Sequence, residues 1–449
     1  MSMQSEEDSQ PQTPGAGAPL PAIPVQHDPY SALRYPAYRL FTIGWMAAVI
    51  GQMMTATAIG WEVYAWTHSE LSLGYVAGIQ VIPLVFLALP GGILADRFDR
   101  RKILSLACIG AAFCSLTLAM ISYHRAHVGW VYLVMLALSC CLTLGRPSRS
   151  AILPHLVPPD VFPNAVTWNA SFFQLSAMLG PAIGGLVLAW NVQAVYIIDA
   201  CCSMAYAVIA ITLPANQIPS HHGEPALSML AKGLKFVWST KIVLATLTLD
   251  LFAVLLGGVV YLLPVFSKDI LHVGATGYGW LRAAESIGAF AMAIVMAHLP
   301  PMRRAGRSML LAVAGFGLCT IVFGISRNFA LSFAMLFVIG ALDNISVVVR
   351  HTLVQVLTPD SMRGRVSSVN NVFIGASNEL GGLESGVTAH WFGPVGSAVF
   401  GGIGSIVTVI ATAIIWPQLL RFGSLIDARP ERPDEPRGFD VIAEKQKEA

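Results

Sequence analysis

The stretch SLGYVAGIQVIPLVFLALPGGILADRFDRRK, residues 72–102, decides the fold. Residues 72–94 contain no charged side chain, and a single helix needs about 20 apolar residues to cross the hydrocarbon core of a bilayer. Residues 95–102 hold two acidic and four basic side chains. Basic loops stay on the cytoplasmic side of a membrane. The stretch therefore predicts a transmembrane helix that ends at a basic cytoplasmic loop.

The same pattern runs through the whole chain of 449 residues. Hydrophobic residues make up 55% of it and charged residues 12%, whereas a soluble domain carries roughly a quarter charged residues. Twelve segments are long and apolar enough to span: about 40–64, 72–94, 103–123, 128–147, 165–189, 193–213, 241–264, 276–298, 308–326, 329–352, 366–389 and 394–418. The longest connection, near residues 214–240, separates six spans from six.

The two sets of six spans are related by an internal repeat. A constant offset of 201 residues aligns them, and it pairs Arg149 with Arg350, Leu156 with Leu357, Pro158 with Pro359, Asn169 with Asn370, Phe172 with Phe373, Gly180 with Gly381 and Gly185 with Gly386. Related halves that enclose a substrate site near the midplane are a known plan of transporters. The sequence predicts an all-α polytopic membrane protein with about 12 transmembrane helices in two pseudo-repeated six-helix bundles.

The expected organisation has five parts. They are a disordered cytoplasmic tail (1–34), an N-terminal bundle (35–213), a cytoplasmic linker (214–240), a C-terminal bundle (241–420) and a second disordered cytoplasmic tail (421–449). The first tail is rich in proline and has no apolar core of the kind that a signal peptide carries. Of 27 Lys and Arg residues, only Arg125, Lys268, Arg282 and Arg327 fall on the predicted outer side. Both termini are therefore expected in the cytoplasm.

The linker contains a helical pattern of its own. Its apolar residues fall on one face and two lysines lie away from it: Leu227, Leu230, Leu234 and Trp238, against Lys232 and Lys235. This pattern fits a short amphipathic helix at the cytoplasmic surface of the membrane. It fits a helical linker equally well.

Several function classes find no support in the sequence. The seven cysteines form no C-x-x-C pair, so no metal or redox site is expected. There is no phosphate-binding G-x-x-x-x-G-K-[ST] loop and no hydrolase motif, so we expect neither a cofactor nor an enzyme. A net charge of +2 does not indicate nucleic-acid binding. The expected partners are a small-molecule substrate, the lipid bilayer and protons, and the chain is expected to be a monomer.

The basic loop carries the first family resemblance. Residues 92–102, Gly-Ile-Leu-Ala-Asp-Arg-Phe-Asp-Arg-Arg-Lys, are similar to the signature loop G-x-L-A-D-R-x-G-R-[RK] of the major facilitator superfamily, with Asp99 in place of its second glycine. The resemblance implies a latch that steadies one access state, formed by Gly92, Asp96, Arg97, Arg100 and Arg101. Physically, Gly92 would allow close helix approach and Asp96 would accept hydrogen bonds from a helix N-terminus. The plainer interpretation is a basic loop that only fixes topology.

A second motif lies in the fifth span. The run Gly180-Pro181-Ala182-Ile183-Gly184-Gly185 resembles the end of the glycine-proline motif of major facilitator antiporters, with Ser176 where a further glycine is expected. Small residues let helices pack closely and proline bends them. We therefore expect a bent packing seam at Gly180, Pro181, Gly184 and Gly185, and the resemblance implies export.

The second half narrows the resemblance. The segments 249–252, 263–266, 350–355, 358–360, 363–366 and 377–381 are similar to the subgroup that contains the enterobactin exporter and related bacterial efflux permeases. The resemblance covers roughly residues 35–420. It implies secondary export across a bacterial inner membrane and does not fix a substrate.

Charged groups inside the spans are the candidates for coupling. A charge near the bilayer centre costs about 2.5–3.5 kcal/mol on insertion scales, and a desolvated carboxyl group can exchange a proton near neutral pH. The candidates for proton coupling or substrate binding are Asp250, Asp343, Glu379, Glu285, Arg282 and Glu384. Each could instead be a structural ion pair, such as Arg282 with Glu285, or one that uses Arg350. Asp250 is the first choice and is expected to face the central cavity.

The sequence favours a proton-coupled exporter of a small hydrophobic or amphiphilic compound, such as a drug or a siderophore. An importer or a lipid flippase on the same fold remains open, because a fold does not determine its substrate. A membrane sensor that binds a ligand without moving it is a third interpretation. A solute-binding or signalling domain would favour this third interpretation, and the tails are too short to supply one.

Overall fold

The computed structural model describes residues 28–214, 226–300, 302, 304–359 and 362–423. This described part is helical and contains no strand. The predictions for residues 1–27, 215–225 and 424–449 lie outside the described residues.

Six long helices build the first half. They are α1 (Pro36–Thr67), α2 (Glu70–Arg97), α3 (Arg100–His124), α4 (Val128–Ile152), α5 (Phe162–Trp190) and α6 (Val192–Thr212), with short 3₁₀ turns η1 (Ser31–Arg34) and η2 (Leu153–His155). Polar residues cap the short connections. Asp99 accepts a hydrogen bond from the backbone N–H of Arg101 at 3.0 Å, and Asn191 accepts one from Ala194 at 3.1 Å. These caps satisfy N–H groups that the first helical turn leaves free.

The second half follows the linker helix α7 (Ala226–Ser239). Its elements are α8 (Lys241–Leu256), η3 (Val259–Leu262), α9 (Leu263–Val265), η4 (Phe266–Ile270), α10 (Gly274–His298), α11 (Ala305–Ile325), α12 (Phe329–Leu357), α13 (Arg363–Ile415) and α14 (Pro417–Arg421). The seventh span therefore breaks after Leu256 and continues through η3, α9 and η4 to Ile270.

Eleven helices of the described part are long and apolar enough to cross a membrane. The longest of them, α13, has 53 residues and turns at Gly393, where φ is 74° and ψ is 165°, just before Pro394. A positive φ suits glycine, and proline cannot continue the preceding helical hydrogen bonding. The bend makes two crossings of α13, which gives the twelve that the hydropathy pattern predicts.

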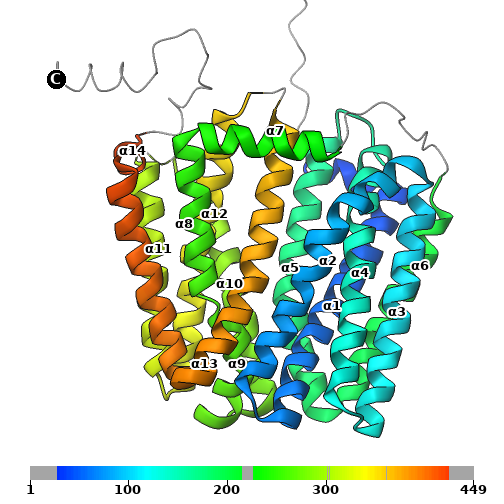
Figure 1. Ribbon diagram of the computed structural model, residues 1–449. Coiled ribbons are helices and arrows are strands. Elements are labelled where there is room, and N and C mark those ends of the chain that lie inside the picture. Colours follow the sequence, from blue (N-terminus) through cyan, green and yellow to red (C-terminus); the bar gives the residue numbers. More distant parts are fainter. Residues whose placement is uncertain (1–27, 215–225, 301, 303, 360–361, 424–449) are drawn as a thin grey trace, which may run out of the picture.

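The two halves repeat the same packing (Figure 1). In the first half α1 packs against α5 and α6, and in the second half α8 packs against α13, which supplies both corresponding crossings. The contact of α3 with α6 is likewise repeated by that of α11 with α13. The halves meet along two seams, α2 with α13 and α5 with α10. The protein is thus an all-α polytopic membrane protein made of two pseudo-repeated six-helix bundles.

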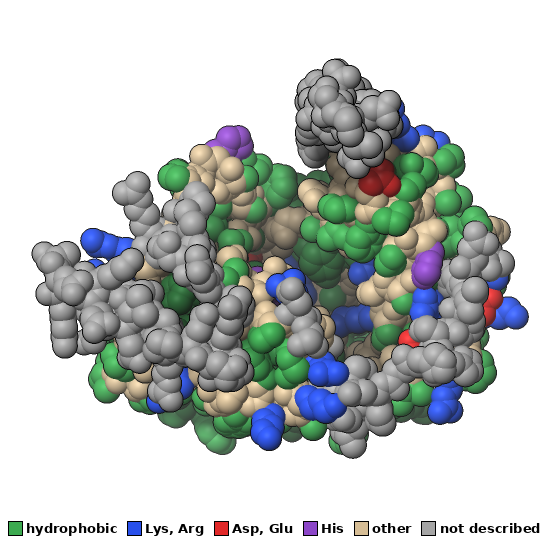
Figure 2. All heavy atoms as spheres, turned by 90° about the horizontal axis from the view of Figure 1, so that it is seen from above, with side chains coloured by type: hydrophobic (Ala, Val, Ile, Leu, Met, Phe, Trp, Pro, Cys, Tyr) green, Lys and Arg blue, Asp and Glu red, His purple; other side chains and the backbone are tan. Residues whose placement is uncertain are grey.

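The seams are tightest at the end of the bundle opposite α7. A methyl group on Gly185 of α5 would lie only 2.6 Å from the Cα of Gly279 on α10, and Gly74 of α2 meets Gly386 of α13 in the same way. The Trp61 and Tyr278 rings stack across the halves nearby, with centroids 5.7 Å apart. At the α7 end, by contrast, the face of the molecule is hollowed between the halves, and apolar and basic side chains line the hollow (Figure 2).

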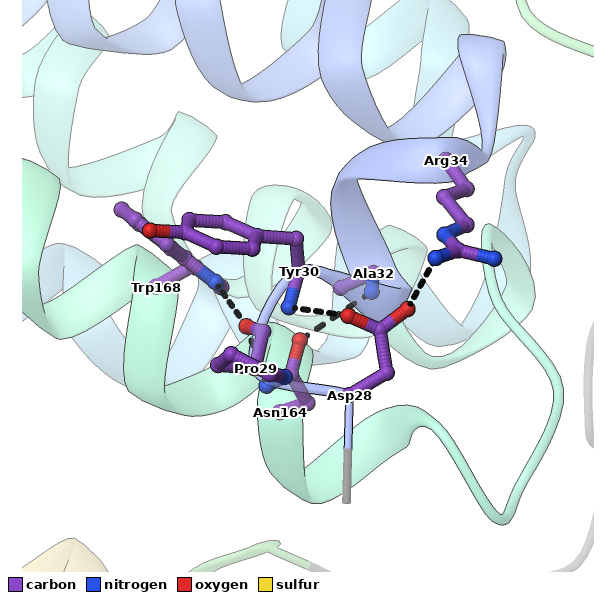
Figure 3. A network of polar contacts seen from close by, with 7 residues as sticks. All are labelled: Asp28, Pro29, Tyr30, Ala32, Arg34, Asn164 and Trp168. Carbon is purple, nitrogen blue, oxygen red and sulfur yellow. Dashed lines mark hydrogen bonds and ion pairs between the residues drawn. The ribbon is translucent and has the colours of Figure 1, made fainter. Parts of the chain in front are cut away.

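Residues 28–34 dock on the start of α5 (Figure 3). The carbonyl of Pro29 accepts hydrogen bonds from the indole N–H of Trp168 at 2.8 Å and from the amide of Asn164 at 2.9 Å. The Tyr30 ring lies 5.7 Å from the Trp168 ring. The segment before α1 therefore ties α1 to α5 at the α7 end.

Helix α7 lies across the ends of α8 and α13 (Figure 1). It packs through Gly233 and Val237, which are buried, whereas Leu234 and Trp238 remain 36% and 63% exposed. A methyl group on Gly233 would lie 2.8 Å from the carbonyl oxygen of Arg365. The apolar face that the sequence singles out is thus left partly open, as an interfacial helix requires.

Candidate functional site

A polar cluster lies where the two halves meet between the hollow and the closed end. At its centre the Glu379 carboxylate of α13 accepts a hydrogen bond from the Tyr261 hydroxyl of η3 at 2.8 Å. It accepts another from the Gln80 amide of α2 at 3.3 Å, which crosses from one half to the other. We call Gln80, Tyr261, Arg282, Glu285, Asp343 and Glu379 the central cluster.

Arg282 supplies the positive charge of the central cluster. One guanidinium nitrogen donates to the Tyr278 hydroxyl at 3.1 Å, and the Tyr278 ring stacks on Trp61 of the other half. The guanidinium also interacts electrostatically with Glu285 and Glu379. The sequence counted Arg282 with the outer basic residues and also named it as a candidate inside the span 276–298; in the structure it lies within α10.

Glu285 and Asp343 form the acidic side of the cluster. Glu285 lies on α10 one turn after Arg282, and Asp343 lies on the adjoining α12, close enough for the two carboxyl groups to interact electrostatically. Within the described residues neither group has a hydrogen bond or an ion pair. The ion pair considered between Arg282 and Glu285 is thus not formed. Proton binding would remove the cost of such an unpaired charge.

Asp250 does not face the hollow, contrary to the expectation from its depth in the span. It is 6% exposed and forms an ion pair with Arg350 of α12, which is 2% exposed. The pair joins α8 to α12 inside the C-terminal half. A cavity of about 10 Å³ lies between Asp250, Asp343 and Ser346, and this volume is close to the minimum for one water molecule.

Two further carboxyl groups of the spans, one half-buried and one buried, also lie outside the cluster. Glu384 lies five residues beyond Glu379 on α13, and its Oε1 atom is buried without a hydrogen-bond partner in the described part. Asp199 lies inside the N-terminal half. There it accepts hydrogen bonds from Ser115 at 2.6 Å and Thr55 at 3.0 Å, so it has the satisfied surroundings of a structural residue.

The signature loop differs in detail from the expectation. A methyl group on Gly92 would meet no atom within 4 Å, whereas on the preceding Gly91 it would lie 3.4 Å from the Cα of Leu144 on α4. The close helix approach therefore occurs at Gly91. Asp96 and Arg97 are exposed in the last turn of α2, and Asp96 contacts no helix N-terminus in the described part of this conformation.

The arginines of the loop tie four helices together instead. Arg100 is buried, and its guanidinium donates to the carbonyl of Ala95 at 3.2 Å and to that of Ala151 at 3.4 Å. Arg101 pairs with Asp99 at 2.9 Å and donates to the carbonyl of Leu213 at 2.6 Å. The Arg101 guanidinium holds the pKa of Asp99 below its usual value. The loop thus joins the ends of α2, α3, α4 and α6.

The glycine-proline run of α5 lies at close contacts with two other helices. Gly180 and Gly184 face α1, and a methyl group on Gly184 would lie 3.0 Å from the Cα of Met54. On the other side, Gly185 and the carbonyl of Pro181 approach Gly279 of α10. The run therefore forms part of the seam that closes one end of the molecule.

Sequence analysis missed four residues of this region. Gln80, Tyr261 and Tyr278 are polar groups inside predicted spans, and that position was the available signal. Arg146 was assigned only to the basic end of the fourth span. It is exposed and interacts electrostatically with Glu379 across the halves. Its neighbour Arg149 instead lies 4.1 Å over the Trp45 ring and donates to Asn169 at 3.2 Å.

A two-half bundle with an ionisable cluster between its halves defines a membrane transporter of the major facilitator type. Solved structures share this fold. A bacterial homologue of the human lysosomal transporter Spinster, in its inward-facing and occupied conformation, matches with a TM-score of 0.68 and 14% identity, covering 91% of this chain and all of that chain. The nucleoside transporter NupG matches with a TM-score of 0.65 and 14% identity, over 85% of this chain and 99% of that chain.

The family is shown by sequence. Residues 27–433 match the family described as transmembrane secretion effectors, and the chain belongs to it. The enterobactin exporters EntS of Shigella boydii serotype 18 and of Escherichia fergusonii are each 27% identical over 401 residues, which is 86% of this chain and 94% of those proteins. The chain is therefore a secondary transporter and not an enzyme.

Proposed function

We propose that this protein is a proton-coupled exporter of a small amphiphilic compound in a bacterial inner membrane, with the α7 end in the cytoplasm. The basic residues of the loops support this orientation. The hollow at the α7 end (Figure 2) would then open to the cytoplasm, while glycine contacts between the halves close the opposite end. That is the state in which an exporter collects its substrate.

The central cluster is the observation that carries the proposal. The Arg282 guanidinium interacts electrostatically with the carboxyl groups of Glu285 and Glu379. Glu285 also interacts electrostatically with Asp343. A proton that binds Glu285 would neutralise this carboxylate, so that Arg282 would interact mainly with Glu379. Release of the proton would restore the attraction between Arg282 and Glu285. Because Glu379 is also hydrogen-bonded to Gln80 of the other half, this exchange would change the contact that joins the halves.

The substrate class follows from the wall of the hollow and from the relatives. The wall is mainly apolar with basic side chains (Figure 2). Arg146 is exposed and interacts electrostatically with Glu379 of the other half. An amphiphile with an acidic or catechol end could pair with Arg146 and lay its apolar part on the wall. A siderophore of this kind agrees with the EntS relatives, which are enterobactin exporters, and a drug of the same character is the other candidate.

Flux in proteoliposomes tests the proposal. The purified protein is tested with and without a pH gradient against a panel of dyes, antibiotics and siderophores. We expect gradient-driven flux of at least one amphiphile, lost in Glu285→Gln. The control is Asp199→Asn, a buried carboxyl group outside the cluster whose hydroxyl partners an amide can keep. Flux that ignores the pH gradient, or that survives Glu285→Gln unchanged, would overturn the proposed coupling.

A further inference from the structure

A pocket of about 330 Å³ lies beneath the linker helix α7, away from the central cluster. Its walls are almost wholly apolar and come from α7, α8 and the region of α13 and α14, among them Trp238, Thr248, Phe252, Phe373 and Trp416. The volume lies at the lower end of the range for small-molecule pockets in proteins. Neither the transport site nor the seams use it.

The pocket faces the membrane and not the interior of the protein. Asp250 points into the C-terminal half, where it pairs with Arg350. Thr248 and Phe252 lie two residues on either side of it, and two residues rotate a helix by about 200°. They therefore lie on the opposite side of α8, and Phe252 is 43% exposed. Helix α7 meets the first turns of α8 at one end of the bundle (Figure 1), and residues of both helices line the pocket.

Positive charge lies at the mouth of this pocket. Lys241 is the exposed first residue of α8 and lies one turn before Leu244 on the same face as Thr248. An apolar pocket with a lysine one turn beyond its wall, at the level of the headgroups, matches the two ends of an anionic phospholipid.

We propose that the pocket binds one acyl chain of an anionic phospholipid from the leaflet on the α7 side, with the lipid phosphate at Lys241. The chain would cover Trp238 and Phe252, which the protein itself leaves exposed. The bound lipid would hold α7 against α8 and α13, because all of them contribute to the wall. This inference uses the orientation of the proposed function but neither its substrate nor its coupling.

Native mass spectrometry of the full chain, released from nanodiscs of phosphatidylglycerol and phosphatidylcholine, tests the site. We expect the wild type to retain one phosphatidylglycerol in preference to phosphatidylcholine. Thr248→Trp fills the pocket and should abolish this retention. Ile403→Trp is the matched control, because it adds the same ring at an exposed position of α13 outside the pocket. Lys241→Gln should lower the preference for phosphatidylglycerol by about fivefold, as expected for one lysine near the headgroups.

A second readout guards against a variant that fails to fold. Phosphatidylglycerol with brominated acyl chains should quench the fluorescence of Trp238 and Trp416. Their share is the difference in quenching between the wild type and the double variant Trp238→Phe/Trp416→Phe. The assignment would be overturned if folded Thr248→Trp retained as much phosphatidylglycerol as the wild type. It would also be overturned if the wild type and Lys241→Gln each retained the two lipids equally. None of these measurements depends on transport, so a failure of the proposed export would leave this result standing.

Discussion

The substitution Gly185→Ala tests how the closed end is held. The new methyl group would lie 2.6 Å from the Cα of Gly279 and 2.9 Å from the carbonyl oxygen of Ala275. Carbon atoms in contact lie about 3.5–4.0 Å apart, so α5 and α10 would have to separate by roughly 1 Å. Overpacking of this kind costs about 1–3 kcal/mol.

This cost falls on only one of the two access states. In a state with the opposite end open, the seam between α5 and α10 would part and the methyl group would have room. A penalty of about 1–3 kcal/mol on the closed end corresponds to a shift of about 5- to 150-fold in the ratio of the two states. Gly185→Ala should therefore populate the state that opens away from α7 and should slow turnover.

Double electron–electron resonance would report this shift as a change in the distance between spin labels at residues 190 and 276. The labels are introduced in a variant without the seven native cysteines. The matched control is Gly92→Ala, because a methyl group at that position meets no atom within 4 Å. The control should keep the wild-type distances. A wild-type distance distribution in Gly185→Ala would refute the reasoning that the glycine contact holds this end closed.

Three further predictions follow from other contacts. Asp96→Asn should leave thermal stability unchanged, since Asp96 is exposed in this conformation, and should lower flux if the loop acts as a latch; normal flux at normal expression would reduce the loop to a topology signal. Asp250→Asn leaves Arg350 buried without its partner and should destabilise the protein by about 3–5 kcal/mol, whereas Asp250→Leu combined with Arg350→Met should recover much of this; equal melting temperatures for the single and double variants would contradict the pairing. Asp99→Ala removes the cap of α3 and should cost about 1 kcal/mol at neutral pH. Because Arg101 holds the pKa of Asp99 below its usual value, the difference in melting temperature should persist down to about pH 4 and shrink at lower pH; a constant difference would speak against a charged cap.

Hydropathy and charge were sufficient to predict the fold. Twelve apolar segments gave the number of crossings, and the repeat that pairs Arg149 with Arg350 gave the two related halves. The break of the seventh span after Leu256 was not predicted, because hydropathy counts apolar length and does not weigh the helix-breaking pair Gly257-Gly258 that follows. The bend at Gly393 fell between two predicted spans, where a connection was expected.

The site was predicted only as a set of candidates. Depth in a span identified Asp250, but not which way it points, and its partner Arg350 lies 100 residues away in the sequence. A rotation of one residue likewise decides that Gly91, and not Gly92, faces α4. Such choices depend on how helices from distant parts of the chain rotate against one another. Periodicity within a single span contains little of this information.

The movement of protons during transport tests the central claim most directly. A pH-sensitive dye trapped inside proteoliposomes would record the internal pH while an outward or inward gradient of a transported amphiphile is imposed. Coupling is reciprocal, so the substrate gradient should drive protons in the opposite direction through the wild type and not through Glu285→Gln. Substrate flux through the wild type without any change of internal pH would contradict proton-coupled export.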